Sequence, residues 1–301
     1  MHTPEHVEHR ITTADGRTLA VAEWGDPNGV TLIEMHGTPG GRISYWLDPS
    51  IDARHHVCRI TFDRPGYGES TRMPGRTVAD VVPDVVAIAD ALGIGRFAVS
   101  GRSGGGPHAL ACATLLPDRV LRCLIAVSVA PYEAAGLDWL AGQTAGNVAE
   151  FKAALEGEAA IRSVAERERR TMLARLSAGR RDYLGDGYEL SAPDRAQMAK
   201  HFARAADNLG NALARGVDGW VDDDIAFTRA WGFDVGKLSV PVYLTYGRLD
   251  TLVPAAHGDW LAAHITGATV VVDDDAGHAG DDALVEEQHA WLAGRTEHRP
   301  S

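Results

Sequence analysis

The amino-acid sequence predicts an α/β fold, with a mostly parallel central sheet flanked by helices and interrupted by a helical insertion. Three observations carry this prediction. Up to residue 131, short apolar runs alternate with helical patterns, and one of these runs turns through glycines into a helix at Ser103. Residues 132–235 contain several helical patterns and no convincing strand, and the alternation then returns. Buried parallel strands are continuous apolar runs because helices cover both faces of their sheet.

The first part of the chain contains most of the predicted strands. Residues 7–13 and 18–24 alternate between polar and apolar side chains around an Asp15-Gly16 turn, which is typical of a hairpin. Continuous apolar runs predict four further strands, at residues 30–35, 57–62, 97–100 and 121–129. Residues 78–92 have apolar side chains at helical spacing, and this helix is predicted to stop at Gly93.

Residues 132–235 are predicted to be a helical insertion. One predicted helix has an apolar face made by Ile161, Ala165, Met172 and Leu176. Another is predicted to open at Ser191-Ala-Pro-Asp194 and to continue with Met198, Phe202, Ala205 and Leu209 in one stripe. Strands at 241–246 and 268–272 and helices at 255–265 and 283–292 follow. We therefore expect a core domain of residues 1–131 and 236–301 and an inserted domain of residues 132–235.

Composition excludes several classes of protein. The 301 residues carry a formal net charge of −12 and no Lys/Arg cluster that could follow phosphates, so nucleic acid is not an expected partner. The acidic balance and the lack of a long apolar run argue against a membrane. Neither metal-ligand spacing nor a signal peptide is recognisable, so we expect no metal, no cofactor and a cytoplasmic protein. Cys58, Cys112 and Cys123 lie in apolar runs and are expected to be core residues.

The segment around Gly101-x-Ser103-x-Gly105 is a candidate nucleophile elbow. A strand turns sharply into a helix there, with a serine at the apex, which exposes its hydroxyl at the carboxyl edge of a sheet. A side chain at either glycine would collide with the neighbouring strand and helix. The alternative is a glycine turn that simply precedes a helix.

Polar residues follow two later strands at the same predicted edge. Asp250 follows the strand at 241–246 and His278 follows the strand at 268–272, so both are expected to meet Ser103. A hydroxyl becomes a good nucleophile when an imidazole takes its proton and a carboxylate fixes the imidazole's tautomer. The aspartates at 273–275 are rival acids, although they are too close to His278 in sequence to reach its Nδ1 easily. Glu133 is the other alternative.

Several motifs occur together and carry a resemblance to one family. They are His36-Gly-x-Pro-Gly40, Asp63-Arg-Pro-Gly-Tyr-Gly-x-Ser70, Gly101-x-Ser103-x-Gly105, Gly247-Arg-x-Asp250-x-x-Val-Pro254 and Gly277-His278. With these motifs the chain resembles the α/β-hydrolase superfamily, whose triad order is serine, acid, histidine. The resemblance places a cap or lid at residues 132–235. It implies that Ser103 is the nucleophile, His278 the base and Asp250 the acid, and that the N–H groups of Thr38 and Gly104 bind the oxyanion.

The same comparison separates the chain from some members of that superfamily. A serine at the elbow argues against haloalkane dehalogenases and epoxide hydrolases, which place an aspartate there. Gly104-Gly105 departs from the Trp-Gly of typical proline iminopeptidases. Gly104 also replaces the methionine of many esterases and cofactor-free haloperoxidases, which should leave room beside the acyl group. His36 is expected to orient its loop, and Asp63 and Arg64 are expected to form a structural pair.

These interpretations predict a serine hydrolase that cleaves a small carboxylic ester, thioester or lactone through an acyl-enzyme. Gly37, Arg102 and Trp220 are expected to contact the substrate, with Trp220 favouring an apolar group. An aminopeptidase is one alternative and would need a carboxylate of the insertion, from Glu150, Glu156, Glu158 or residues 222–224, to hold the substrate's ammonium. A ligand-sensing protein with this fold is another. The expected partner is a small molecule, and the chain is expected to be a monomer or homodimer.

Overall fold

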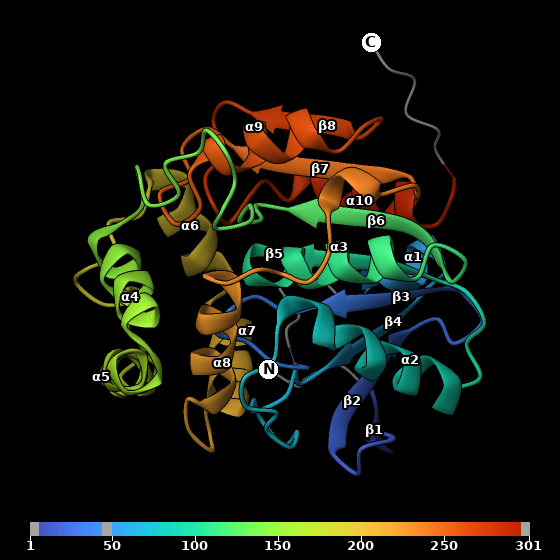
Figure 1. Ribbon diagram of the computed structural model, residues 1–301, viewed down its shortest axis with the longest axis horizontal. Helices are drawn as coiled ribbons and strands as arrows, with labels where there is room; N and C mark the ends of the chain where they lie inside the picture. The colour runs from blue at the N-terminus through green and yellow to red at the C-terminus, as the bar shows by residue number, and fades with distance from the viewer. Residues whose placement is uncertain (1–5, 44–49, 296–301) are drawn as a thin grey trace.

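The computed structural model describes residues 6–43 and 50–295, and in these ranges eight strands form one sheet (Figure 1). Their order is β1-β2-β4-β3-β5-β6-β7-β8. The strands are β1 (Val7–Thr12), β2 (Thr18–Gly25), β3 (Val30–Met35), β4 (Val57–Phe62), β5 (Phe97–Arg102), β6 (Val120–Ala126), β7 (Val242–Gly247) and β8 (Thr269–Asp273). The pairs β1–β2 and β2–β4 are antiparallel and the remaining neighbours are parallel. The mostly parallel sheet predicted from the sequence is confirmed.

Helices pack on both faces of this sheet. Helices α2 (Val81–Ala91) and α3 (Gly106–Leu115) pack together on one face, and α1 (Ser50–His55) and α10 (Ala283–Leu292) pack together on the other (Figure 1). Helix α9 (Ala255–His264) packs on β7. Every residue of β4 and β7 is buried, because these inner strands are covered from both sides. Cys58, Cys112 and Cys123 are buried and unpaired with one another, as expected.

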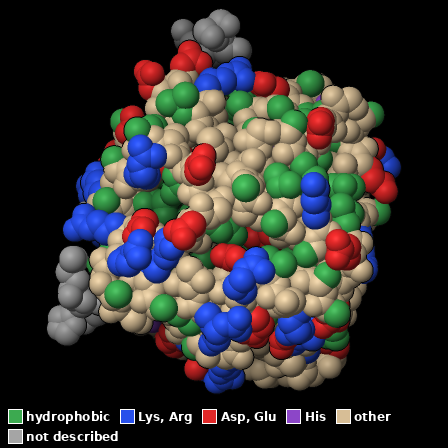
Figure 2. Space-filling model, turned by 90° about the vertical axis from the view of Figure 1, so that its left-hand side faces the viewer, with side chains coloured by type: hydrophobic (Ala, Val, Ile, Leu, Met, Phe, Trp, Pro, Cys, Tyr) green, Lys and Arg blue, Asp and Glu red, His purple; other side chains and the backbone are tan. Residues whose placement is uncertain are grey.

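Residues 132–235 form helices that stand at the end of the sheet where β3, β6 and β7 finish (Figure 1). These are α4 (Ala145–Glu156), α5 (Glu158–Ser177), α6 (Ala192–Lys200), α7 (Phe202–Ala212) and α8 (Asp218–Phe227). Most of their buried apolar side chains form a second cluster, which Tyr67 of the core joins, whereas Phe151 of α4 and Phe227 of α8 belong to the cluster of the sheet. Acidic and basic side chains are interspersed over the face that this end of the molecule presents (Figure 2).

Some element boundaries differ from those expected. The helix predicted to run on from Ser191 divides at His201 into α6 and α7, because the two parts bind different loops of the core: Asp194 of α6 binds the Ala279 amide, and Asn208 of α7 binds the Gly41 amide. The strand expected at 121–129 ends at Ala126, since Val127 has a φ of 46° and turns the chain away.

Smaller turns complete the fold. The helix expected at 78–92 consists of a 3₁₀ turn at Val78–Asp80 followed by α2. Two further 3₁₀ turns lie at Ser103–Gly105 and Val235–Lys237. None of the helices in residues 6–43 and 50–295 combines the length and the apolar character that a bilayer span requires.

Candidate active site

Ser103 lies where β5 turns into α3, in a backbone conformation that serine rarely adopts. Its φ is 54°, in the left-handed region. The turn is tight on both sides: a Cβ added at Gly101 would lie 2.2 Å from the Gly105 carbonyl oxygen, and one added at Gly105 would lie 2.1 Å from that of Met35. Glycine is therefore required at both positions, and the strand-turn-helix geometry expected from the sequence is present.

His278 and Asp250 are joined by a hydrogen bond. His278 Nδ1 lies 2.8 Å from Asp250 Oδ2, and the Asp250 side chain is fully buried. The other carboxyl oxygen of Asp250 accepts the backbone N–H groups of Leu252 and Val253, each at 2.8 Å. The two backbone N–H groups thus fix the Asp250 carboxylate through Oδ1, and its Oδ2 holds the imidazole of His278. Its rival Asp273 instead accepts the N–H of Asp275 in its own loop, at 3.0 Å.

Ser103 and His278 line the same two adjoining cavities, which have volumes of about 240 Å³ and about 100 Å³. In the described part of the chain no hydrogen bond joins the Ser103 hydroxyl to His278. Hydrogen bonds between catalytic groups are commonly long before substrate binds and shorten in the complex. The structure therefore brings serine, histidine and aspartate to one edge of the sheet, with the histidine–aspartate contact already made.

Thr38 packs directly against Gly104. A Cβ added at Gly104 would lie 2.3 Å from Thr38 Oγ1 and 3.1 Å from the ring of Phe227. The Thr38 hydroxyl donates to Asp223 of α8 at 2.7 Å, which fixes the loop that follows β3. The two residues expected to bind the oxyanion are therefore neighbours beside Ser103.

His36 orients this loop, as expected. Its Nε2 accepts the backbone N–H of Arg64 at 3.1 Å, and its Nδ1–H donates to the carbonyl of Gly37 at 2.7 Å. These two bonds require the neutral imidazole. Burial, followed by the charge of Arg64, holds the pKa of His36 well below its usual range.

The expected pairing of Asp63 with Arg64 is wrong. Asp63 binds Arg42 at 2.5 Å, whereas Arg64 binds Asp223 at 2.6 Å. Asp223 also pairs with Arg76 at 2.6 Å. Burial alone would raise the pKa of Asp223, but the charges of Arg64 and Arg76 outweigh it and hold that pKa well below its usual range. Both residues are structural, but Arg64 has its partner in the insertion, which short-range sequence reasoning could not reveal.

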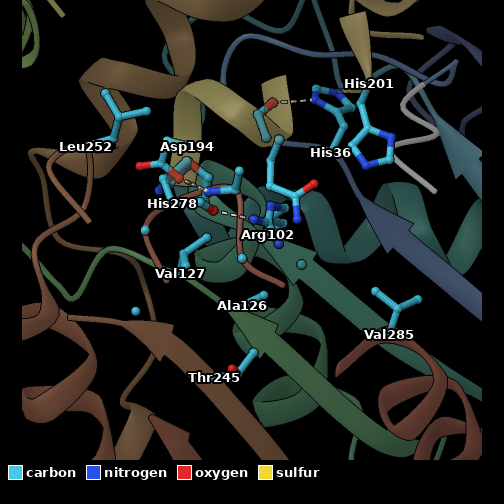
Figure 3. Close-up of a pocket in the computed structure, with 18 of the residues that line it drawn as sticks. His36, Arg102, Ala126, Val127, Asp194, His201, Thr245, Leu252, His278 and Val285 are labelled. Carbon is cyan, nitrogen blue, oxygen red and sulfur yellow. Dashed lines mark hydrogen bonds between the residues drawn. The ribbon is translucent and has the colours of Figure 1, made fainter. Parts of the chain in front are cut away.

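The three residues expected to contact substrate have different surroundings. Gly37 and Arg102 line the larger cavity, and the Arg102 guanidinium donates to the backbone carbonyl of His278 (Figure 3). Arg102 therefore ties the loop that carries His278 to the elbow. Trp220 lines the smaller cavity, and its indole N–H donates to Glu150 at 2.6 Å. The indole N–H of Trp220 is therefore already bonded to the Glu150 carboxylate, and the smaller cavity has a polar group as well as apolar ones.

Asp194 was not predicted as part of the site. Its Oδ1 accepts the N–H of Ala279 at 2.6 Å, and it lies close to His278 (Figure 3). Its Oδ2 accepts the hydroxyl of Ser191 at 2.7 Å. The sequence indicated only the helix cap at Ser191, because the partner of Asp194 is 85 residues away.

No group of three or more His, Cys, Asp or Glu side chains in residues 6–43 and 50–295 is arranged to hold a metal ion. The chemistry available at the described site is that of Ser103, His278 and Asp250. Glu150 and Asp224 line the smaller cavity, and the titratable side chains that line the larger cavity include Asp194, His201 and Asp282.

A mostly parallel sheet with serine, aspartate and histidine on the loops after β5, β7 and β8 is the arrangement of the α/β-hydrolase class. A family model described as "alpha/beta hydrolase fold" matches residues 30–280, and the chain belongs to that family.

The chain is similar to several named proteins. A pimeloyl-[acyl-carrier protein] methyl ester esterase of Nitrosomonas europaea is 28% identical over 254 residues, which are 84% of this chain and 90% of that protein. The dihydrolipoyllysine-residue acetyltransferase component of the acetoin cleaving system of Pseudomonas putida is 35% identical over 130 residues, 42% of this chain and only 34% of that protein. The structure of an enol-lactonase from Burkholderia xenovorans shares the fold, with a TM-score of 0.65 and 19% identity, over 95% of this chain and 97% of that one.

Proposed function

We propose that the protein is a serine hydrolase that cleaves a small carboxylic ester, thioester or lactone through an acyl-enzyme on Ser103. The observation that carries this proposal is the 2.8 Å hydrogen bond between the buried Asp250 and His278, which lines the same cavity as Ser103. The family of the chain supports hydrolysis, and the esterase and lactonase among the similar proteins support an ester bond as the target.

In this mechanism Ser103 Oγ attacks the substrate carbonyl while His278 Nε2 accepts its proton. Asp250 holds Nδ1–H and stabilises the imidazolium that forms. The negative charge on the carbonyl oxygen is directed to the N–H groups of Thr38 and Gly104. His278 then gives the proton to the leaving alcohol or thiol, which departs as the acyl–serine ester forms. A water molecule then attacks that ester while His278 takes its proton, and His278 gives this proton to Ser103 Oγ as the carboxylic acid leaves.

Replacing the nucleophile tests the proposal. Ser103→Ala should lose about 10⁶-fold in kcat for an aryl ester and should no longer be labelled by an organophosphonate. Ser163→Ala is a matched control, because Ser163 is exposed on α5 and outside both cavities. Turnover or labelling of Ser103→Ala close to that of the unmodified protein would refute the assignment.

The two alternative functions predict different kinetics. A ligand-sensing protein would release one burst of product and then stop, whereas the proposed hydrolase turns over continuously. An aminopeptidase would cleave proline aryl amides faster than aryl esters. Both comparisons use the unmodified protein.

A further inference from the structure

Arg102 places a positive charge in the larger cavity, directly before the nucleophile in sequence. Side chains of a strand alternate between the two faces of its sheet, so Ser100 and Arg102 of β5 share a face, and both line this cavity. Arg102 is half-buried. In residues 6–43 and 50–295, no carboxylate forms an ion pair with its guanidinium. Taking a charge out of water without a partner is unfavourable, so this cation requires an explanation.

Other arginines of the core that are withdrawn from water are neutralised directly. Four of them are at most 6% exposed, and each binds a carboxylate. They are Arg42 with Asp63 at 2.5 Å, Arg59 with Asp52 at 2.7 Å, and Arg64 and Arg76, each with Asp223 at 2.6 Å. Arg102 departs from this pattern. Burial lowers the pKa of Arg102, although a guanidinium remains protonated at neutral pH.

Most of the hydrogen-bonding capacity of Arg102 is unused. A guanidinium has five N–H groups. Within the described residues Arg102 donates one of them, to the backbone carbonyl of His278 (Figure 3). None of its nitrogen atoms is both buried and without a partner, so the unused N–H groups are accessible from the cavity. Paired N–H groups on a planar guanidinium match the two oxygens of a carboxylate.

The carboxylates that line the same cavity have donors elsewhere. Asp194 accepts the N–H of Ala279. Asp282 binds Lys200. Three others complete the described set: Glu34 binds Arg59, Asp273 accepts the N–H of Asp275, and Asp281 accepts the N–H of Ala283. None of these carboxylates pairs with Arg102, so its guanidinium is open to an anion that enters the cavity.

We propose that Arg102 forms a subsite for a carboxylate of the substrate, and that the chain acts on small esters that carry a second, ionised carboxyl group. This proposal rests on the proposed function, because the scissile ester is defined by its reaction with Ser103. The guanidinium contacts the loop of His278, so the bound carboxylate lies on the His278 side of the nucleophile. A volume of about 240 Å³ accommodates a small ester together with this second group.

The charge of the subsite favours a carboxylate over a phosphate. A phosphate monoester carries nearly two negative charges at pH 7, whereas a carboxylate carries one. The described lining of the larger cavity contains two guanidinium groups, and that of Arg59 is already bound by Asp52 and Glu34. A single unpaired guanidinium balances one negative charge, and its N–H groups can reach both oxygens of one carboxylate.

Two matched pairs of esters test the proposal. Monomethyl glutarate and methyl glutaramate differ in the acyl portion, where a primary amide replaces the carboxylate. 4-Acetoxybutyrate and 4-acetoxybutyramide differ in the same way in the alcohol portion. At pH 7 the unmodified protein should prefer the charged member of one pair about tenfold or more in kcat/KM, because hydrogen bonds to a charged group are stronger. The pair that shows this preference identifies the portion that Arg102 binds, and preference in neither pair would overturn the subsite.

Three variants locate the preference. Arg102→Gln should lower the ratio of kcat/KM for the charged ester to that for the neutral ester about tenfold or more, whereas Arg102→Lys keeps the charge and should retain most of the ratio. Arg119→Gln is the control, because Arg119 also donates to a backbone carbonyl, that of Ile94 at 2.7 Å, but lies outside both cavities. It should keep the ratio. Loss of the bond to the His278 carbonyl alone would slow both esters equally, so an unchanged ratio in Arg102→Gln would overturn the subsite.

A binding measurement keeps the test decisive where turnover is absent. Glutaramate should bind the unmodified protein about tenfold more tightly than glutaramide in calorimetry, and Arg102→Gln should remove the difference. Equal binding of the two compounds to the unmodified protein refutes the subsite. Absence of hydrolysis of every ester, with binding of glutaramate that depends on Arg102, would instead refute the proposed function and retain the subsite.

Discussion

At the scale of single residues, the site depends on one unfavourable backbone conformation. A side-chain-bearing residue in the left-handed region is less stable by about 1–2 kcal/mol than in its ordinary conformation. Ser103 is held there because the chain on either side is pinned, with Gly101 against Gly105 and Gly105 against Met35. The result is a serine side chain that lines both cavities. The spacing of the two glycines is what made this residue predictable from the sequence.

The hydrogen bonds of Asp250 make a specific prediction for Asp250→Asn. The Asn oxygen would keep the bonds from the Leu252 and Val253 amides, so its NH₂ group would face His278 Nδ1. The imidazole would then carry its proton on Nε2 and could no longer accept the proton of Ser103. We expect kcat to fall about 10³- to 10⁴-fold with little change in stability, measured with an aryl ester.

The rival acids supply the control for that variant. Asp274 is 89% exposed in its side chain and lies in the loop before His278. Asp274→Asn should therefore keep the activity of the unmodified protein. If Asp274→Asn lost more activity than Asp250→Asn, the acid would have been assigned to the wrong residue.

At the scale of elements, most of the sheet could be predicted and the contacts of the insertion could not. The strands at 30–35 and 57–62 match to the residue, because apolar side chains dominate both short runs even though one contains Glu34 and the other Arg59. The division between α6 and α7 was missed because the apolar stripe continues across His201. The helical period reports which face is buried, but it contains no information on which loop a polar side chain reaches.

Helix α6 illustrates the consequence, because it holds the loop that carries His278. Asp194 accepts the Ala279 N–H from one side and Arg102 donates to the His278 carbonyl from the other. We predict that Asp194→Ala lowers kcat about tenfold while KM changes little, since one charge-assisted hydrogen bond to the loop is lost. Steady-state kinetics with an aryl ester measure both constants.

Ser191→Ala separates this effect from the stability of the helix. Ser191 caps α6 and binds Asp194, but it does not touch Ala279. Both variants weaken the cap, whereas only Asp194→Ala releases the loop. An equal fall in kcat in the two variants would mean that Asp194 acts only through the helix.

At the scale of the whole molecule, three consecutive aspartates show how the insertion is joined to the core. Asp222 binds Arg72, Asp223 binds Arg64 and Arg76, and Asp224 faces the smaller cavity. In the sequence these residues resemble a solvated acidic run, and nothing in their spacing distinguishes them. Their separate roles exist only because α8 is enclosed between the core and α4 and α5. The triad could be predicted from strand ends, while this junction depends on tertiary packing.

The buried histidines give the molecule a pH-dependent stability. His257 Nδ1 accepts the Ala130 N–H at 3.1 Å and its Nε2–H donates to the Trp139 carbonyl at 3.0 Å, so it must be neutral. Burial lowers the pKa of His257 to about 4. Burial, and then the charge of Arg64, lower the pKa of His108 to about 4. These values lie below the ordinary pKa of about 6.5 that histidine regains in the unfolded chain.

The sign of the effect follows from proton uptake. Between pH 6.5 and 4 the unfolded chain binds more protons than the folded protein, so the free energy of unfolding falls as the pH falls. For His257 alone the loss between pH 7 and pH 5 should be about 2 kcal/mol. Urea unfolding at pH 7, 6 and 5 measures this loss.

In His257→Gln, the free energy of unfolding should fall by about 2 kcal/mol less between pH 7 and pH 5 than in the unmodified protein, because one titrating group is gone. His264→Gln, on the exposed side of the same helix, should keep the pH dependence of the unmodified protein. Stability that is constant from pH 7 to 5, or an unchanged slope in His257→Gln, would contradict the neutral, buried state of this histidine.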